Sequence, residues 1–162
     1  MRVISGTARG TKLKSIEGWS TRPTLDRVKE SLFNIIQDNI KDSVVLDLFS
    51  GSGAIAIEFL SRGAKKAYLC EKNFSSIKMI YENLERTRLK DKTIVINKDY
   101  KKCLDIMQKE EIKFDFIFLD PPYRADFAVD ATKRILEKNL LKEKGTIIIE
   151  TDDEKRELLE IE

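Results

Sequence analysis

The feature that most constrains the fold is a regular alternation of strand and helix patterns after residue 43. Short apolar runs typical of buried strands are separated by stretches in which apolar residues recur at helical spacing. Strands separated by helices favour a parallel sheet covered on both faces. Right-handed crossovers then predict a doubly wound, Rossmann-like α/β fold. The expected strands are 44–48, 67–70, 93–96, 114–119 and 146–149, and the expected helices are 54–61, 75–89, 100–108 and 126–140.

The first forty residues have a different character. Residues 1–23 lack a helical period, and Arg9 to Leu13 predicts a basic hairpin or arm. Thr24 is expected to cap a helix that runs to about Asn39. The first thirty residues carry seven basic and three acidic side chains, which indicates a polyanionic partner, although the net charge of the chain is only +2. We expect one domain over 1–162, with an arm and helix over 1–40 and an α/β core over 41–162.

The composition excludes several kinds of chemistry. The chain has no histidine, which rules out Ser-His-Asp and Cys-His catalysis and argues against a catalytic zinc site, so no metal is expected. Cys70 and Cys103 lie too far apart in sequence to indicate a metal motif or a disulfide framework, and Cys70 is expected to be a small, reduced core residue. No apolar run approaches the roughly 20 residues of a membrane span, and no signal peptide is visible, so we expect a cytoplasmic protein.

The first strand ends in a glycine-rich turn, Phe49 to Gly53, that leads into a helix. Glycines let a ligand approach the backbone closely, and a helix N-terminus offers free N–H groups to an anion. Residues 51–56 match the pattern G-x-G-x-x-G/A, and Glu71 follows where an acid would bind ribose hydroxyls. An NAD-dependent dehydrogenase is therefore one interpretation.

Acidic residues at the strand ends favour another ligand. Asp47 at the end of the first strand would crowd a pyrophosphate, but it suits the positive charge of S-adenosylmethionine. Glu71 and Asp99 end the next two strands, at the edge where such folds bind ligands. These acids favour S-adenosylmethionine over a dinucleotide. The expected cofactor-binding residues are Asp47, Phe49, Ser50, Gly51, Ser52, Gly53, Glu71, Lys72, Asp99 and Tyr100.

The tetrapeptide Asp120-Pro121-Pro122-Tyr123 directly follows the apolar strand 114–119. The two prolines fix the backbone and remove two N–H donors, which leaves carbonyl groups to accept hydrogen bonds. A carboxylate and a carbonyl can hold an amine, and an aromatic ring can stack on a base. The tetrapeptide therefore predicts a grip on a planar, amine-bearing base, with a Pro-Pro turn and a helix-capping acid as the structural alternative.

Together, the glycine turn with Asp47, Glu71 and the tetrapeptide resemble class I S-adenosylmethionine-dependent amino-methyltransferases. Residues 2–13 and 22–34 are similar to the RsmD-type 16S ribosomal RNA guanine-N2 methyltransferases, and the resemblance covers essentially the whole chain. It implies that Asp120 to Tyr123 hold the target guanine. It also implies that the basic residues Arg9, Lys12, Arg22 and Arg27 face RNA.

The resemblance implies S-adenosylmethionine as cofactor and 16S ribosomal RNA or a small-subunit particle as partner, with no membrane contact; we expect a monomer. The catalytic turn alone leaves an adenine-N6 methyltransferase open, and a non-catalytic RNA-binding module is a third interpretation. Relatives continue into two further strands. Here only about a dozen residues follow Ile149, so we expect either that the chain is truncated or that the last strands are missing.

Overall fold

The structure is a computed structural model that describes residues 1–15, 23–121 and 126–150. No helix in this described part of the chain is long and apolar enough to span a membrane. In chain order the elements are α1 (Pro23–Ile36), the 3-10 turn η1 (Gln37–Asn39), β1 (Val44–Asp47), α2 (Ala54–Ser61), β2 (Lys66–Cys70), α3 (Phe74–Thr87), the 3-10 turn η2 (Lys90–Lys92), β3 (Thr93–Ile96), α4 (Tyr100–Lys109), β4 (Phe114–Leu119), α5 (Phe127–Glu137) and β5 (Leu141–Ile149).

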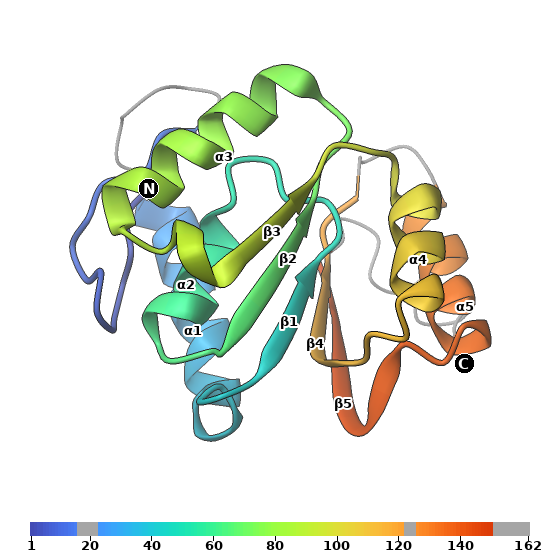
Figure 1. Ribbon diagram of the computed structural model, residues 1–162. Coiled ribbons are helices and arrows are strands. Elements are labelled where there is room, and N and C mark those ends of the chain that lie inside the picture. The colour runs from blue at the N-terminus through green and yellow to red at the C-terminus, as the bar shows by residue number, and fades with distance from the viewer. Residues whose placement is uncertain (16–22, 122–125, 151–162) are drawn as a thin grey trace.

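The five strands form one parallel sheet in the order β3-β2-β1-β4-β5, which confirms the expected Rossmann-like α/β fold. Figure 1 shows α1, α2 and α3 on one side of the sheet and α4 and α5 on the other. Two apolar clusters fill these two layers. Val45, Leu69 and Phe116 pack in the first cluster, whereas Leu46, Cys70 and Ile117 pack in the second, because successive side chains of a strand point to opposite faces.

The strand order reverses between β1 and β4. Asp47, the last residue of β1, is in register with Leu69 of β2 and Phe118 of β4, so the carboxyl ends of these strands meet at one edge. A crevice outside the carboxyl ends at such a reversal is the usual ligand site of open α/β sheets. The fold therefore places the glycine turn and the residues after β4 beside each other.

The element boundaries differ from the sequence expectations in two instructive places. The first helix begins at Pro23, so Thr24 is its second residue and not its cap; proline suits the first turn because its missing N–H has no helical partner there. Strand β5 begins at Leu141, earlier than expected. Residues 142–145 in its first half are three charged residues and a glycine, which an edge strand tolerates. These residues interrupt the apolar run from which a strand is predicted.

Helix α2 ends at Ser61, just before the glycine Gly63. Gly63 has φ +108°, and its N–H donates to the carbonyl of Leu60 at 3.1 Å. The N–H of Ala64 donates to the carbonyl of Phe59 at 3.0 Å, which completes a Schellman motif. The helix can therefore turn directly into β2.

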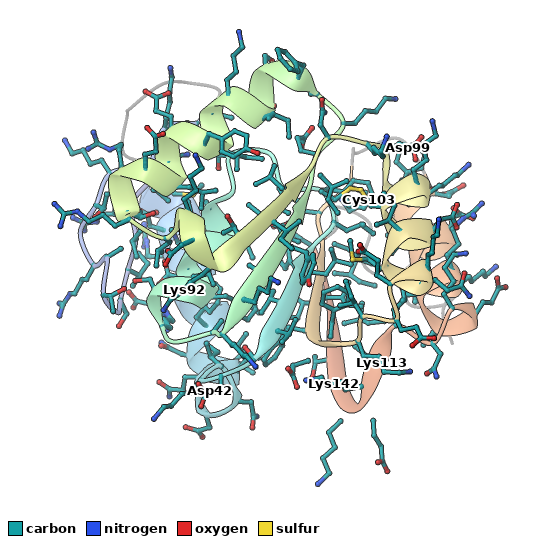
Figure 2. All side chains as sticks on the ribbon, viewed as in Figure 1. Asp42, Lys92, Asp99, Cys103, Lys113 and Lys142 are labelled. Carbon is teal, nitrogen blue, oxygen red and sulfur yellow. A yellow bond between two sulfur atoms is a disulfide. The ribbon has the colours of Figure 1, made fainter. Side chains whose placement is uncertain are left out.

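The prediction of a reduced Cys70 is wrong, because Cys70 and Cys103 form a disulfide (Figure 2). Cys70 is the last residue of β2 and points toward the α4 side of the sheet, where Cys103 lies on the buried face of α4. Their 33-residue separation gave no sign of this contact. Strand β2 and helix α4 are separated in sequence by α3 and β3. Whether two such cysteines meet therefore depends on how the elements pack, and their spacing in the sequence does not show it.

The N-terminal segment forms a hairpin over residues 1–13, of which the stretch 9–13 expected from the sequence is the second half. Arg2 and Lys12 make an antiparallel bridge, and the N–H of Val3 donates to the carbonyl of Thr11 at 2.9 Å. The hairpin lies beside α2 and α3 (Figure 1). Its core side chains Val3 and Leu13 are fully buried. This end of the chain is therefore part of the packed domain.

Several buried polar side chains fasten the hairpin, among them Glu58 and Asn83. The carboxylate of Glu58 on α2, which is 0% exposed, accepts hydrogen bonds from the N–H groups of Ile4 and Ser5 at 3.0 and 3.1 Å. It also pairs with Lys29 of α1 at 3.3 Å and Arg62 at 2.7 Å. Burial lowers the pKa of Lys29, and the Glu58 carboxylate opposes that shift. Glu58 thus joins the hairpin, α1 and α2.

Asn83 of α3 makes a second connection. Its side-chain amide donates to the carbonyls of Lys14 and Ser52, both at 2.9 Å, and its oxygen accepts from the N–H of Lys14 at 2.8 Å. Since Ser52 belongs to the glycine turn, one buried side chain fixes the hairpin and the turn relative to each other.

Candidate active site

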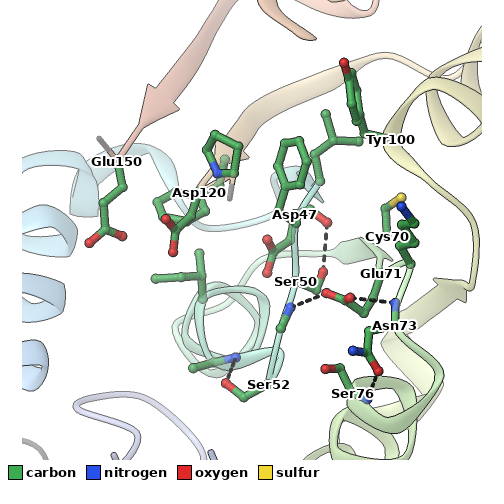
Figure 3. A pocket seen from close by; sticks show the side chains of 18 of the residues that line it. Asp47, Ser50, Ser52, Cys70, Glu71, Asn73, Ser76, Tyr100, Asp120 and Glu150 are labelled. Carbon is green, nitrogen blue, oxygen red and sulfur yellow. Dashed lines mark hydrogen bonds between the residues drawn. The ribbon is translucent and has the colours of Figure 1, made fainter. Parts of the chain in front are cut away.

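A cavity of about 1010 Å³ opens at the carboxyl edge of the sheet, around the reversal between β1 and β4. Figure 3 shows side chains from the ends of β1, β2, β4 and β5 and from the start of α4 gathered around it. Most of the residues predicted from the sequence line this cavity: Asp47, Phe49, Ser50, Gly51, Ser52, Glu71, Lys72, Asp99, Tyr100, Asp120 and Pro121.

Asp47 is the most unusual residue of the cavity. It is 1% exposed, yet neither of its carboxylate oxygens has a hydrogen-bond partner among the described residues. Burial raises the pKa of Asp47 to about 7. The nearby N–H of Ala56 and the hydroxyl of Ser50 oppose this rise, and the carboxylates of Asp120 and Glu71 add to it. A buried carboxylate without a partner is costly, and a cationic ligand in the cavity would remove that cost.

The glycine turn is held in shape by Glu71. One oxygen of this carboxylate accepts the N–H of Gly51 at 2.8 Å, and the other accepts the N–H of Asn73 at 2.8 Å (Figure 3). Gly51 has φ +57°, and a side chain added there would meet no atom within 4 Å, so the turn presents open backbone to the cavity. Each Glu71 oxygen keeps a second lone pair for a ligand hydroxyl.

Gly53 has a different position from the other predicted cofactor residues. It does not line the cavity but precedes α2, with φ +82°. A β-carbon there would lie 3.3 Å from the side chain of Leu69 on β2. Gly53 therefore allows the helix to pack closely against the sheet, and it serves the site indirectly.

Asp99 and Tyr100 start α4 at the edge of the cavity. Asp99 caps this helix, since its Oδ1 accepts the N–H of Lys102 at 2.9 Å, and it also lines the cavity. The Tyr100 hydroxyl donates to Asp130 of α5 at 2.5 Å, and burial followed by this bond raises the pKa of Tyr100. The rings of Phe49 and Phe127 lie 5.3 and 5.2 Å from that of Tyr100, forming an aromatic wall.

The predicted catalytic turn is described in part. Asp120 and Pro121 line the cavity directly after β4, whereas Pro122 and Tyr123 lie outside the described residues. Asp120 is exposed to the cavity, in contrast to Asp47. The structure therefore places the acid of the tetrapeptide in the same cavity as the glycine turn.

Sequence reasoning missed several cavity residues, among them Lys29, Phe127 and Glu150. Lys29 lies on α1, Phe127 starts α5, and Glu150 follows β5. Glu150 was recognisable, because it is an acid directly after an apolar strand, as Asp47, Glu71 and Asp120 are at or after theirs. Lys29 and Phe127 carried no such signal, since helical spacing does not show which residues reach a distant strand edge.

The basic residues predicted to face RNA do not line the cavity. Arg9 and Lys12 are exposed on the hairpin and Arg27 is exposed on α1, while Arg22 lies outside the described residues. Lys14 pairs with Glu82 of α3 at 3.3 Å. All of these described residues belong to the side of the sheet that α1, α2 and α3 cover.

The whole chain, residues 1–162, matches the protein family described as "Conserved hypothetical protein 95". The chain belongs to this family. It is 41% identical over 154 residues to the Bacillus subtilis protein named "Putative rRNA methyltransferase YlbH", an alignment that covers 95% of this chain and 84% of the relative. It is 37% identical to "Ribosomal RNA small subunit methyltransferase D" of Haemophilus influenzae, over 96% of this chain and 80% of that protein.

Solved structures have a fold similar to that of this chain. The structure titled "Putative methyltransferase yhhF from Escherichia coli" superposes with a TM-score of 0.80 at 30% sequence identity, and the match covers 93% of this chain and 81% of that chain. The Rossmann-like architecture is thus shared with a protein whose title calls it a putative methyltransferase.

Proposed function

We propose that this protein transfers a methyl group from S-adenosylmethionine to the exocyclic N2 amine of a guanine in 16S ribosomal RNA. The observation that carries the proposal is the row of carboxylates along one sheet edge, in which buried Asp47 lacks a partner and Asp120 faces the same cavity. The relatives named as ribosomal RNA methyltransferases support the choice of RNA as the substrate.

The cavity residues fit S-adenosylmethionine. The unpartnered carboxylate of Asp47 suits a cationic group, and the open backbone at Gly51 suits close contact with a ligand. Glu71 offers remaining lone pairs for hydroxyl groups beside the same turn. When bound, S-adenosylmethionine supplies an electrophilic methyl group on a sulfonium, and loss of that methyl leaves a neutral thioether.

Asp120 is placed to act on the amine. The exocyclic nitrogen of guanine is a poor nucleophile, since its lone pair is delocalised into the ring. A carboxylate that accepts one of its N–H bonds favours a tetrahedral nitrogen, and it stabilises the positive charge that develops as the nitrogen gains a methyl group. The nitrogen then loses one proton to Asp120 or to water. The stacking role expected for Tyr123 stays a prediction from the sequence.

The hairpin supplies the contact with RNA. Arg9 and Lys12 are exposed on a segment that Glu58 and Asn83 fix to the cofactor turn. Phosphate contacts made by such residues position a nucleic acid without reading its sequence. RNA held by the hairpin is thereby oriented relative to the cavity.

Transfer of labelled methyl groups to unmethylated small-subunit particles tests the proposal. Wild-type protein should methylate the RNA. Asp120→Ala should lose methyl transfer by on the order of 100-fold or more, while its affinity for S-adenosylmethionine in calorimetry stays unchanged. Asp91→Ala, an exposed acid in η2, is the matched control and should remain active. Binding of NAD in place of S-adenosylmethionine, or full activity of Asp120→Ala, would contradict the proposal.

A further inference from the structure

Glu150 lies at one end of the row of carboxylates, next to Asp120. It directly follows β5, and its N–H donates to the carbonyl of Leu119 at 2.8 Å. Because Leu119 is in register with Ile149, Asp120 and Glu150 leave two hydrogen-bonded parallel strands at the same level. Figure 3 shows both side chains on the same side of the cavity.

The alternation of side chains explains why Glu150 reaches the cavity. Ile148 packs with the apolar cluster on the α1–α3 side, and Ile149 packs with the cluster on the α4–α5 side. The next residue, Glu150, returns to the α1–α3 side. On β4, Leu119 packs with the α4–α5 cluster and Phe118 lines the cavity, so the next alternation brings Asp120 to the cavity side as well. The two acids therefore project together from neighbouring strand ends.

An independent feature marks this cavity as a ligand site. Asp47 on the adjacent strand β1 is 1% exposed and unpartnered within the described structure, and it lines the same cavity. The carboxylates thus fall into two groups. Asp47 and Glu71 lie at the glycine turn, whereas Asp120 and Glu150 lie on the two strands beyond it, away from β2.

Two acceptors side by side match guanine. The edge of guanine that carries the N2 amine presents three hydrogens in a row, two on N2 and one on N1. The corresponding edge of adenine presents an amine beside N1, which is an acceptor. A carboxylate accepts hydrogen bonds and donates none. A pair of carboxylates can therefore bind N2–H and N1–H of guanine, whereas adenine would bring a lone pair against one of them.

We propose that Glu150 is the residue that selects guanine, by accepting N1–H while Asp120 accepts N2–H. This inference rests on the proposed function, since it names a specificity residue of that same site. It supplies the discrimination between guanine and adenine that Asp120 and the prolines do not provide. A site built to hydrogen-bond an N–H group rejects strongly an analogue that lacks it.

The decisive substrate is 2-aminopurine, which keeps the N2 amine but has an acceptor at N1. The nucleotide that wild-type protein methylates is mapped first on unmodified small-subunit particles. Particles are then reconstituted from 16S RNA ligated to carry guanosine or 2-aminopurine riboside at that position. The quantity measured is the ratio of kcat/KM for the two particles. Cofactor affinity and melting temperature are measured in parallel for each variant.

Wild-type protein should prefer guanine on the order of 100-fold or more. Glu150→Gln should narrow this ratio by about tenfold or more, because the glutamine amide can also donate to N1. Its cofactor affinity should stay that of the wild type. Glu143→Gln, an exposed acid at the opposite end of β5, is the matched control and should keep the wild-type ratio.

The outcomes separate this inference from the function on which it rests. If wild-type protein makes N2-methylguanosine but Glu150→Gln keeps the wild-type ratio of kcat/KM for the two particles, only the role of Glu150 is overturned. Wild-type protein that makes no N2-methylguanosine would overturn the proposed function, and the role of Glu150 with it.

Discussion

The two faces of the sheet differ in chemistry. On the side covered by α1, α2 and α3, the strand ends carry the carboxylates of Asp47, Glu71, Asp120 and Glu150, and the layer contains buried Glu58 and Asn83. The side covered by α4 and α5 is an apolar layer closed by the Cys70–Cys103 disulfide and by aromatic rings. Successive side chains of a strand point to opposite faces of the sheet. A slip of one residue in strand register would therefore move every side chain to the other face.

The difference shows how one edge of a sheet can bind two substrates. Carboxylates on adjacent strands converge only because each projects to the same face. The opposite layer holds the strands in place and contributes the wall formed by Tyr100, Phe49 and Phe127. The α1–α3 side therefore combines apolar packing with the buried ion pairs of Glu58, whereas the α4–α5 side combines apolar packing with a disulfide.

Breaking the buried ion pairs of Glu58 should have the largest effect on stability. Glu58→Gln leaves Lys29 buried without its counter-charge and should lower the free energy of unfolding by about 3–5 kcal/mol in urea denaturation. The matched control is Glu82→Gln, which breaks the exposed pair with Lys14 and should cost less than about 1 kcal/mol. Equal losses in the two variants would show that Glu58 is no anchor.

The apolar face should respond to reductant. Opening the Cys70–Cys103 disulfide frees a loop of 33 residues and should lower the free energy of unfolding by about 3–4 kcal/mol. Urea denaturation with and without a reducing agent measures this. The double variant Cys70→Ser/Cys103→Ser should be insensitive to the reductant. An equal response of wild type and variant would rule out the covalent link.

The strand patterns alone were enough to predict the parallel sheet, the glycine turn and the strand-end acids Asp47, Glu71, Asp99 and Asp120. Glu150 was within reach by the same rule. Other features depended on contacts between distant segments. The Cys70–Cys103 disulfide, the Glu58 hub and the Asn83 bridge join residues whose sequence separation carries no pattern. Buried polar residues on helices look like ordinary surface residues until their partners are known.

Buried Asp47 should make the affinity for the cofactor depend on pH. With its pKa raised to about 7, Asp47 is largely protonated below that pH and ionised above it. Affinity for S-adenosylmethionine should therefore rise by up to about tenfold per pH unit toward pH 7 and level off above it. Asp47→Asn should bind weakly with no such dependence. Calorimetry between about pH 6 and about pH 8 measures both proteins.

The same group should affect the stability of the unliganded protein in the opposite direction. Its folded pKa of about 7 lies above the ordinary value of 3.8, so the folded state binds more protons between these values. Stability from Asp47 is fully present below the ordinary value and is lost as the pH rises through about 7, by at most about 1.4 kcal/mol per pH unit. A slope in Asp47→Asn equal to that of wild type would contradict this assignment.

The smallest effect should come from the exposed charges. Arg9→Glu/Lys12→Glu should weaken RNA binding by about tenfold at low salt and reduce the salt slope by about 1 for each lost phosphate contact, without changing cofactor affinity. Filter binding across salt concentrations measures this. Lys109→Glu/Lys133→Glu makes the same charge change on the α4–α5 side and should leave the slope unchanged. Similar salt slopes in both double variants would show that the hairpin does not contact RNA.

The most direct test of the central claim is the identity of the methylated nucleoside. Unmethylated small-subunit particles are incubated with wild-type protein and labelled S-adenosylmethionine, and the RNA is digested and separated by chromatography. A row of carboxylates that accepts the N–H groups of guanine predicts N2-methylguanosine as the labelled product. N6-methyladenosine, or the absence of label in the RNA, would contradict it.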